Sequence, residues 1–241
     1  MKSNQDFKNE ALAALRGNWA PAILATVAIL AIESIVISPG VYSSIHLRQA
    51  MAEINPTDPA AVMQVIQSAN SFSSIQFLLS VFLLFPLTIG FVNAFKLLLQ
   101  NGDNKLTANT FRISFSNYWH KVWGYFLMYI LIMLWSLLLI IPGIIKALSY
   151  AMTPYILEDN PELSASDAIH LSRTMMKGHK FDLFYLFLGF LGWLLLSILT
   201  LGIGLLWLIP YMQTAFAAFY QEVKDDMGDD FEAQIRATAN L

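Results

Sequence analysis

The feature that most constrains this chain is the segment Leu183–Gln221, which contains no Asp, Glu, Lys or Arg in 39 residues. A helix needs about 20 apolar residues to cross a bilayer core. One continuous helix of 39 residues would measure about 58 Å, whereas the hydrocarbon core is about 30 Å thick. The segment is therefore long enough for two membrane-crossing helices joined by a turn, and it excludes an ordinary soluble domain.

The composition of the whole chain agrees with this interpretation. Charged residues make up 13% and apolar residues 56% of the 241 residues, whereas a soluble domain typically carries about 25% charged residues. The net charge of −3 provides no basic field that would attract nucleic acid. The chain has no cysteine, which excludes disulfides, thiolate metal ligands and cysteine nucleophiles. We therefore expect an all-α fold, a polytopic membrane helix bundle.

Apolar runs and helix breakers divide the chain into six expected transmembrane helices. The breakers are Ser38-Pro39-Gly40, Asn101-Gly102-Asp103, Pro142-Gly143 and the segment 200–204. The expected spans are residues 19–37, 75–99, 122–141, 143–157, 183–200 and 204–221. Within the second span, Pro86 and Gly90 predict a kink. Residues 1–222 then form one transmembrane domain, and residues 223–241 form a solvated acidic tail.

The positive charges predict the orientation of these spans. Twelve of the 14 Lys and Arg residues fall on the side that holds both termini. Cytoplasmic segments of membrane proteins are enriched in Lys and Arg. We therefore expect both termini in the cytoplasm and the loop 38–74 outside the cell. Within that loop, Asp58 is expected to cap a short helix that begins at Pro59.

Three segments of the chain share one plan, in which a short amphipathic helix and a polar break precede an apolar hairpin. They begin at Phe7, Leu106 and Leu163. An offset of 61 residues aligns the second and third segments, with Gly143 on Gly204. The pattern predicts an internal repeat. The alternative is that a bilayer imposes similar lengths and interface residues on unrelated hairpins.

The third amphipathic segment, 164–176, shows the expected properties of these short helices most clearly. Its apolar residues gather on one face, either Ser164 or Ser166 is placed to cap its N-terminus, and Asp167 lies in the first turn. Two interpretations fit this pattern equally. Either the helix lies in the cytoplasmic interface with its apolar face toward lipid, or it packs against the protein as a connector.

Several motifs resemble those of one bacterial family. Residues 138–146 read Leu-Leu-Ile-Ile-Pro-Gly-Ile-Ile-Lys, residues 175–180 read Met-Met-Lys-Gly-His-Lys, and residues 202–211 end in Ile-Pro-Tyr. On these motifs the chain resembles the integral-membrane family known as domain of unknown function 975, outside the loop 38–74 and the tail after 222. The resemblance implies a multi-pass protein of the bacterial cytoplasmic (inner) membrane. It implies no activity, because none is established for that family.

A search for catalytic and metal-binding motifs finds none. The four histidines do not stand three or four residues apart, and no His-Glu-x-x-His or Walker sequence is present. The acidic run Asp225–Asp229 matches a diphosphate-binding spacing, but that chemistry needs a second acidic cluster facing it. We therefore expect a protein that is not an enzyme and that has no cofactor, no metal and no catalytic residue.

Two groups of charged residues remain as candidate sites. Glu33 and Lys146 lie inside expected spans at similar depth in the outer leaflet, and a charge in lipid costs about 2.5–3.5 kcal/mol. We expect them to form an intramembrane ion pair; the alternative is that each side chain reaches separately to the outer headgroups. The candidates for binding anionic lipid headgroups stand at the cytoplasmic ends of spans and are Arg16, Lys121, Lys177, Lys180, His120 and His179.

These observations leave three functional classes. The first is a non-enzymatic membrane module that engages lipid or a partner protein. The second is a transporter or lipid-handling protein with a cavity between repeated hairpins, which the break at Pro86–Gly90 favours because transporters often use broken helices near the midplane. The third, a membrane enzyme, lacks any catalytic motif. The sequence favours the first class, with membrane lipids as the expected partners.

Overall fold

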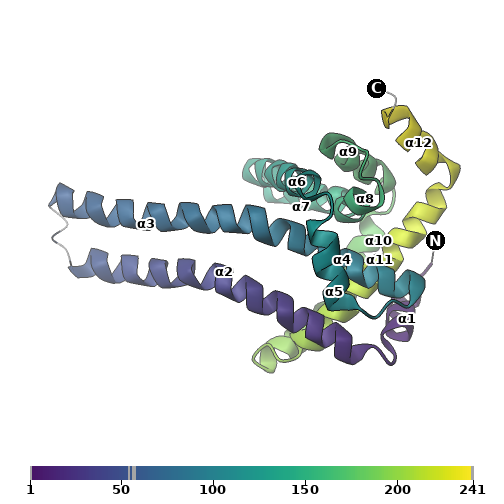
Figure 1. The fold of residues 1–241 in the computed structure, drawn as a ribbon, viewed down its shortest axis with the longest axis horizontal. Coiled ribbons are helices and arrows are strands. Elements are labelled where there is room, and N and C mark those ends of the chain that lie inside the picture. The colour runs from purple at the N-terminus through teal and green to yellow at the C-terminus, as the bar shows by residue number, and fades with distance from the viewer. Residues whose placement is uncertain (1, 54, 56–57, 240–241) are drawn as a thin grey trace.

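The computed structural model describes residues 2–53, 55 and 58–239, with the backbone alone for 39–44, 46, 66, 68–75 and 237–239. This part of the chain is helical and contains no β-strand (Figure 1). The helices in chain order are α1 (Asn4–Leu15), α2 (Trp19–Glu53), α3 (Pro59–Leu79), the π-helical turn η1 (Ser80–Leu84), α4 (Phe85–Asn101), α5 (Leu106–Phe115), α6 (Tyr118–Leu138), α7 (Ile140–Tyr150), α8 (Thr153–Asp159), α9 (Ala165–Met175), α10 (Lys180–Leu199), α11 (Leu205–Met227) and α12 (Asp229–Ala239).

Five stretches within the described residues are long and apolar enough to cross a membrane. They are Trp19–Ser38, Gln76–Asn101, Tyr118–Leu138, Ile140–Asp159 and Lys180–Leu199. Each overlaps one of the first five expected spans. The sixth expected span, 204–221, is not among them. It belongs to α11, whose middle contains Gln213 and the fully buried Thr214 and whose C-terminal half packs inside the protein.

Two prolines stand in the first turns of helices rather than at the turns between them. The turn between α6 and α7 lies at Leu139, so that Pro142 falls in the first turn of α7. Pro154 likewise stands in the first turn of α8, directly after the break between α7 and α8. Proline is well tolerated there because the first backbone N–H groups of a helix have no partner within the helix. The expected turn at Pro142-Gly143 was therefore placed three residues too late.

The kink expected at Pro86 is a local change of helix type. The five residues before α4 form the π-helical turn η1, and Pro86 follows in the first turn of α4. A proline ring disturbs the carbonyl four residues before it, which here belongs to Phe82. The hydroxyl of Tyr118 donates a hydrogen bond to that carbonyl. The side chain of a neighbouring helix thus satisfies the group that Pro86 cannot pair.

The expected loop 38–74 is a helical hairpin instead. α2 continues through Pro39 and Gly40 to Glu53, and Asp58 caps α3 by accepting hydrogen bonds from two N–H groups in its first turn. The side-chain amide of Gln76 on α3 donates to the carbonyl of Ile37, at 3.0 Å, directly before the predicted break. Proline inside a membrane helix is tolerated where neighbouring helices supply polar contacts to the backbone around it. The cap at Asp58 and the helix start at Pro59 are confirmed, whereas the helix end at Ser38-Pro39-Gly40 was wrong.

This hairpin gives the molecule its elongated shape. α2 has 35 residues, against 21 in α6 and 20 in α10, which makes it about 20 Å longer than either. Figure 1 shows the α2–α3 hairpin extending far beyond the tips of the α6–α7 and α10–α11 hairpins, while both termini lie at the opposite end. We call residues 39–53 and 59–75, with the connection between them, the arm.

The three expected repeat units have the same order of elements. In each, a short helix (α1, α5 or α9) precedes a long hairpin. The turns before the long helices contain Gly17, Asn117 and Gly178, all with positive φ, at 83°, 43° and 99°. Glycine and asparagine are the residues that enter this conformation most readily. The repeat itself stays a prediction, which these turns support.

A contact between helices also recurs at the offset of 61 residues. A Cβ atom on Gly143 would lie 2.8 Å from the Cα atom of Ser136, and one on Gly204 would lie 2.9 Å from the Cα atom of Ser197. Both distances are shorter than any ordinary carbon contact, so only glycine fits at either place. Within the α6–α7 hairpin and within the α10–α11 hairpin, the two helices thus approach each other through a serine–glycine pair at the corresponding position.

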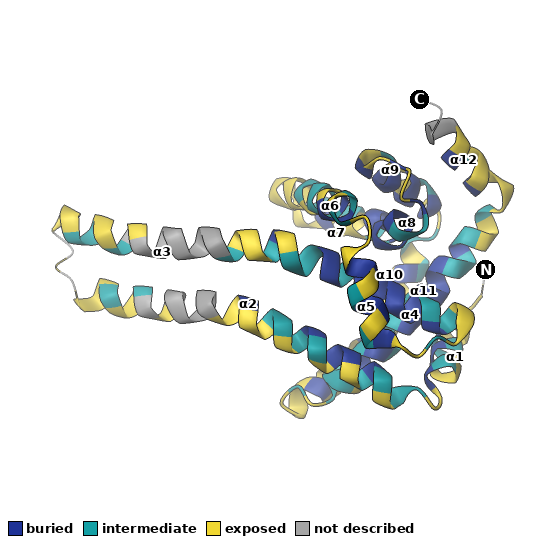
Figure 2. Cartoon of the chain, viewed as in Figure 1, coloured by how far each residue is buried: buried dark blue, intermediate teal, exposed yellow. Residues whose placement is uncertain are grey.

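The short amphipathic helices pack against protein. Phe7, Ala11 and Leu15 of α1 are fully buried, as is Leu106 of α5. The apolar face predicted for α9 is also buried, against α6 and α8, and Ser164 is its cap. Figure 2 shows buried residues concentrated where α4, α8, α9 and α11 meet, with exposed residues along α6 and the arm. Of the two interpretations, the packed connector is the correct one for α9.

The C-terminal segment is a packed helix. Its acidic residues Asp229, Asp230 and Glu232 occupy the first turn of α12, where a carboxylate is favourable. Phe231 and Ile235 are buried against the main core. The described part of the tail therefore packs against the bundle through apolar residues that recur four apart on one helical face, while its acidic residues are exposed as expected.

Candidate functional site

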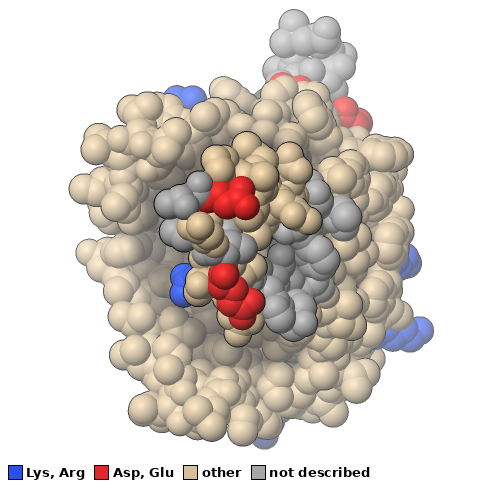
Figure 3. All heavy atoms as spheres, turned by 90° about the vertical axis from the view of Figure 1, so that its left-hand side faces the viewer, with Lys and Arg blue, Asp and Glu red and all other residues tan. Residues whose placement is uncertain are grey.

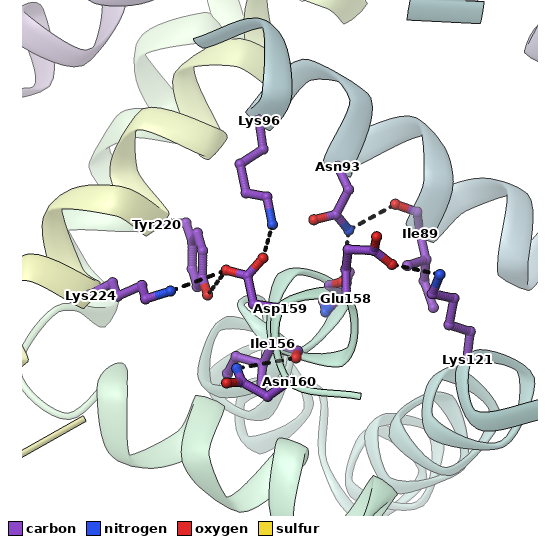
Figure 4. Close-up of polar contacts among 11 residues, drawn as sticks. Ile89, Asn93, Lys96, Lys121, Ile156, Glu158, Asp159, Asn160, Tyr220 and Lys224 are labelled. Atoms are coloured by element: carbon purple, nitrogen blue, oxygen red, sulfur yellow. Dashed lines mark hydrogen bonds and ion pairs between the residues drawn. The ribbon is translucent and has the colours of Figure 1, made fainter. Parts of the chain in front are cut away.

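A cluster of charged side chains lies where α4, α6, α8 and α11 meet (Figure 4). Its centre is the C-terminal end of α8, which carries Glu158 and Asp159 and is followed by Asn160. Carboxylates are unfavourable at the negative end of a helix dipole unless cations compensate them. Lysines from the three other helices supply that compensation here, so the packing of these helices brings the cluster together.

Asp159 is the most connected member of the cluster. One carboxylate oxygen pairs with the ammonium group of Lys96, whose side chain is only 3% exposed. The other oxygen accepts a hydrogen bond from the hydroxyl of Tyr220 at 2.8 Å and lies 3.3 Å from Nζ of Lys224. Asp159 therefore joins α8 to α4 and to α11 through charged contacts.

Glu158 makes the corresponding contact to α6. Its Oε2 atom lies 2.6 Å from Nζ of Lys121. The same ammonium group also donates to the carbonyl of Ile113 and to the hydroxyl of Ser116, at 2.7 Å for the latter. Lys121 is fully buried. The expectation that Lys121 binds lipid headgroups does not agree with this position, because its three donors are directed at protein groups.

Asn93 adds a neutral contact between α4 and the start of α8. Its side-chain amide donates to the carbonyl of Pro154 at 2.9 Å and to that of Ile89, also at 2.9 Å. The Asn93 side chain is buried, and its Oδ1 atom accepts no hydrogen bond within the described part of the chain. Asn93 and Lys96 stand one turn apart on α4, so both ends of α8 are bonded to the same helix face.

The cluster is built to hold helices together. Every ammonium and carboxylate group in it has a protein partner, so no charged group described in the cluster stands free to bind a ligand. Removing one partner of such a buried pair typically costs about 3–5 kcal/mol, because a charge is then left buried without compensation. We therefore interpret the cluster as a structural joint on the side of the bundle that bears the termini.

Glu33 and Lys146, both of which the structure describes, do not form the expected ion pair. Lys146 instead lies 4.4 Å from the ring centre of Trp135 and 5.9 Å from that of Tyr150. Trp135 stands on α6 and Lys146 on α7, on opposite sides of the same turn. Two aromatic rings thus take the place of the carboxylate, since a cation is attracted to the face of an aromatic ring.

Glu33 faces a small cavity of about 230 Å³ between α2, α4 and α11. The cavity is lined by Thr26, Ile29, Leu30, Glu33, Thr88, Phe91, Ile209 and Gln213. The Glu33 carboxylate has no hydrogen bond or ion pair among the described residues. Of the two intramembrane candidates named from the sequence, Glu33 is therefore the one whose charged group has no partner among the described residues.

The other headgroup candidates occupy different environments. Arg16 and Lys177 are exposed and Lys180 is partly exposed, as headgroup binding requires. His179 instead lies between two carboxylates, 3.6 Å from Asp182 and 3.5 Å from Asp226. His179 thus connects α10 to the end of α11.

His120 is a different case from His179. Its side chain is partly buried, and its Nε2 atom is buried with no hydrogen-bond partner within the described residues. A buried nitrogen does not contact a lipid phosphate, so Nε2 of His120 is not the atom that would bind a headgroup.

A larger apolar groove lies between α1, α2 and the α10–α11 hairpin. Its volume is about 410 Å³, and it is lined by Leu12, Trp19, Trp193, Leu196, Ser197, Thr200, Gly204, Trp207, Leu208 and Tyr211. Trp193 and Trp207 are 57% and 48% exposed, so the groove is open along its side. Its size is within the range of small-molecule pockets, about 300–1,000 Å³.

Helix α1 closes one wall of this groove and is fixed in place. Phe7 stacks edge-on against Phe219 of α11, with ring centres 5.5 Å apart. The ammonium group of Lys8 donates to the carbonyl of Gly189 on α10 at 2.8 Å and lies 4.9 Å from the ring centre of Phe190. The groove is therefore bounded by helices held firmly against one another.

Sequence reasoning named none of the acidic residues of the cluster and none of the groove residues as site residues. One signal for the cluster was present, because Lys96 lies inside the expected span 75–99 and was counted only as a cytoplasmic charge. A lysine within a span requires a partner, and Glu158-Asp159 directly follows the fourth expected span at 157. The groove has no such signal, since tryptophans near helix ends are typical of any membrane protein.

Comparison with known proteins gives one match. Neither curated proteins nor solved structures match the chain. Residues 137–227, from the end of α6 to the end of α11, match a family model described as "Protein of unknown function (DUF975)". The match includes the hairpin α10–α11 and the residues Glu158, Asp159, Tyr220 and Lys224. Over this segment the chain is similar to that family, as its motifs predicted, and the family's function is itself unknown.

Proposed function

We propose that this protein is a non-enzymatic, multi-pass module of a bacterial cytoplasmic membrane that binds an anionic phospholipid at its side. The observation that carries the proposal is the groove of about 410 Å³ with three tryptophans in its lining. A groove that opens sideways between membrane helices meets lipid tails before any other molecule. An acyl chain matches its mainly apolar lining, whose polar side-chain groups are the hydroxyls of Ser197, Thr200 and Tyr211 and the indole N–H groups of the three tryptophans.

Arg16 supplies a binding group for the lipid phosphate. It follows Leu12, a groove residue, by four positions, which is about one helical turn. Arg16 is exposed, and the charged residues of α1 itself, Asp6, Lys8 and Glu10, all lie further toward the N-terminus. A guanidinium group binds phosphate through two parallel hydrogen bonds. The groove and Arg16 together therefore suit an anionic phospholipid.

The distribution of charge supports cytoplasmic termini. Both termini lie at one end of the molecule (Figure 1). Figure 3 views the opposite end, where Asp and Glu appear at the tip of the arm and uncharged residues make up most of the surrounding surface. An end rich in Lys and Arg is expected to face the cytoplasm. Arg16 would then meet the leaflet of the membrane that carries anionic lipid.

The test compares two substitutions on α1 in the purified full-length protein. Leu12→Glu places a charge in the groove, whereas Ala13→Glu places the same charge on an exposed position of the same helix. The protein is reconstituted in phosphatidylcholine with added phosphatidylglycerol that carries brominated acyl chains, which quench tryptophan fluorescence on contact. We expect strong quenching in the parent and in Ala13→Glu, and weak quenching in Leu12→Glu. Equal quenching in all three proteins would refute lipid binding in the groove.

A second experiment tests the headgroup contact. Arg16→Gln should remove the preference for phosphatidylglycerol over phosphatidylcholine while leaving quenching by the neutral lipid unchanged. Lys105→Gln is the matched control, because Lys105 is also exposed and lies outside the groove. If Lys105→Gln reduces the preference as much as Arg16→Gln does, the selectivity comes from the general positive charge and not from a site.

The cavity at Glu33 favours one alternative function, transport of a small cationic solute. A carboxylate in an intramembrane cavity, with Thr88 and Gln213 beside it, offers polar groups of the kind that bind an ammonium group or a proton. The π-helical turn η1 ends four residues before Thr88, and such turns are frequent at functional sites. Uptake of an alkylammonium ion into proteoliposomes that is abolished by Glu33→Gln, and unaffected by Leu12→Glu, would favour this function over lipid binding.

A further inference from the structure

The tips of the α6–α7 and α10–α11 hairpins are the most exposed apolar parts of the molecule. Leu137, Ile140 and Leu201 are 80%, 78% and 95% exposed. No charged residue lies between Lys121 and Lys146, or between Asp182 and Glu222. A loop that crosses a membrane and emerges on the far side normally carries polar residues. Figure 3 shows the same property from outside, since uncharged residues surround the base of the arm.

The helix lengths place these tips short of the far surface. From Lys121 to Leu139 there are 18 residues, and from Lys180 to Leu201 there are 21, which correspond to about 27 Å and 31 Å of straight helix. The hydrocarbon core is about 30 Å thick, and the bilayer with its headgroups is about 40–45 Å thick. A helix that starts among the headgroups of one leaflet, and that tilts by the usual angle of about 20°, ends before it leaves the opposite hydrocarbon.

The first hairpin differs in this respect. α2 has 35 residues from Trp19 to Glu53, about 52 Å of helix, which exceeds the full thickness of the bilayer with its headgroups. Its distal part carries Arg48 and Glu53, and Asp58 follows at the tip. The arm is therefore long enough and polar enough to reach the aqueous phase.

The backbone at the α10–α11 tip suits a water-free environment. In the α10–α11 turn, the N–H of Gly202 donates to the carbonyl of Ser197, and the N–H of Gly204 donates to the hydroxyl of Thr200. The N–H groups of Leu201, Ile203 and Leu205 also find carbonyl partners within the turn. Hydrocarbon tolerates a turn only where backbone groups are satisfied in this way. In the α6–α7 turn, Pro142 reduces the number of free donors because it has no N–H.

We infer that the α6–α7 and α10–α11 hairpins end inside the hydrocarbon of the distal leaflet, and that the α2–α3 hairpin alone among the described elements emerges on that side. The lipid acyl chains are the partner that covers the apolar tips. The surface that the protein offers to a molecule on that side of the membrane then consists of the arm.

Single cysteines introduced into the full chain test this inference, because the native sequence has none. The positions are Ile140 and Leu201 at the tips, Gln49 on the arm as a positive control, and Lys105 at the end that bears the termini. The purified variants are reconstituted into vesicles of phosphatidylethanolamine and phosphatidylglycerol. A charged maleimide is admitted to both faces by freeze–thaw, so that the result does not depend on orientation or on lipid binding in the groove.

We expect cysteines at 49 and 105 to react, and those at 140 and 201 to react at least about tenfold more slowly, because a thiolate does not form in hydrocarbon. All four should react fully in SDS. A fluorophore attached at 201 in detergent should then be quenched, after reconstitution, by a spin label on the acyl chain and not by iodide. Labelling at 140 and 201 at the rate of 49, or quenching at 201 by iodide, would overturn the inference.

Discussion

The strongest test of the charged cluster is a double-mutant cycle on Lys96 and Asp159. Asp159→Asn removes the carboxylate from Lys96, which is 2% exposed and has no other carboxylate in contact among the described residues. Breaking a buried pair in this way typically costs about 3–5 kcal/mol. Lys96→Met should cost less, because Asp159 keeps Tyr220 and Lys224 as partners.

Two more variants, Lys224→Met and the double variant, give the free energies of unfolding with which the single variants are compared. Lys224→Met should cost only about 0–1 kcal/mol, because the Lys224 side chain is 32% exposed and water can replace it. The double variant Lys96→Met with Asp159→Asn leaves neither a buried cation nor a buried anion. Its cost should therefore be smaller than the sum of the two single costs by about 1–3 kcal/mol.

The assay is the unfolding of the purified protein in detergent with increasing SDS, followed by loss of helical circular dichroism. Lys105→Met is the control, since Lys105 is exposed and lies outside the cluster. The expected order of destabilisation is Asp159→Asn, then Lys96→Met, then Lys224→Met. Strict additivity in the double variant, or a cost for Lys224→Met equal to that for Lys96→Met, would refute the interpretation of the cluster as a buried joint.

Three further predictions follow from other contacts. Gly204→Ala should cost about 1–3 kcal/mol of stability, because the new Cβ would lie 2.9 Å from Ser197 Cα, whereas Gly192→Ala, which meets nothing within 4 Å, should be neutral or stabilising in the same SDS assay. Glu33→Gln and Lys146→Met should be additive to within about 0.5 kcal/mol, since the two side chains are not paired; a larger interaction energy would contradict the structure. The Ser3 hydroxyl and then its backbone N–H hold the pKa of Asp6 below its ordinary value of 3.8, so the cap of α1 is complete above that pH and is lost as the pH falls through the lowered pKa. The protection of residues 4–15 against hydrogen exchange, relative to the intrinsic exchange rate at each pH, should therefore fall in acid in the parent, and the fall should be smaller in Ser3→Ala.

Features that depend on composition and local sequence were predictable. The apolar runs identified five helices that can cross a membrane, because a run of that length has no alternative in a soluble fold. Asp58, and either Ser164 or Ser166, were predicted as caps from their position before a helical pattern, and Asp58 and Ser164 accept hydrogen bonds from backbone N–H groups of the first turn. Such signals lie within a few residues of the structure that they determine.

Features that depend on contacts between distant helices were not predictable. Pro39 does not end α2, which continues packed along α3, and Gln76 of α3 donates to the carbonyl of Ile37 two residues before the proline. The depth of Glu33 and Lys146 was estimated from their positions along helices, but depth does not say which way a side chain points around the helix or which helix is its neighbour. Lys121 was assigned to the surface because its partner Glu158 follows 37 residues later in the sequence.

The measurement that tests the central proposal most directly is a cryo-electron microscopy structure of the full-length protein in a nanodisc that contains phosphatidylglycerol. The account predicts density for one acyl chain along the groove between Trp193 and Trp207, with the lipid phosphate in contact with the guanidinium group of Arg16. A groove that is closed by protein side chains, or that is open and holds no ordered lipid while Arg16 points away from the membrane, would contradict it.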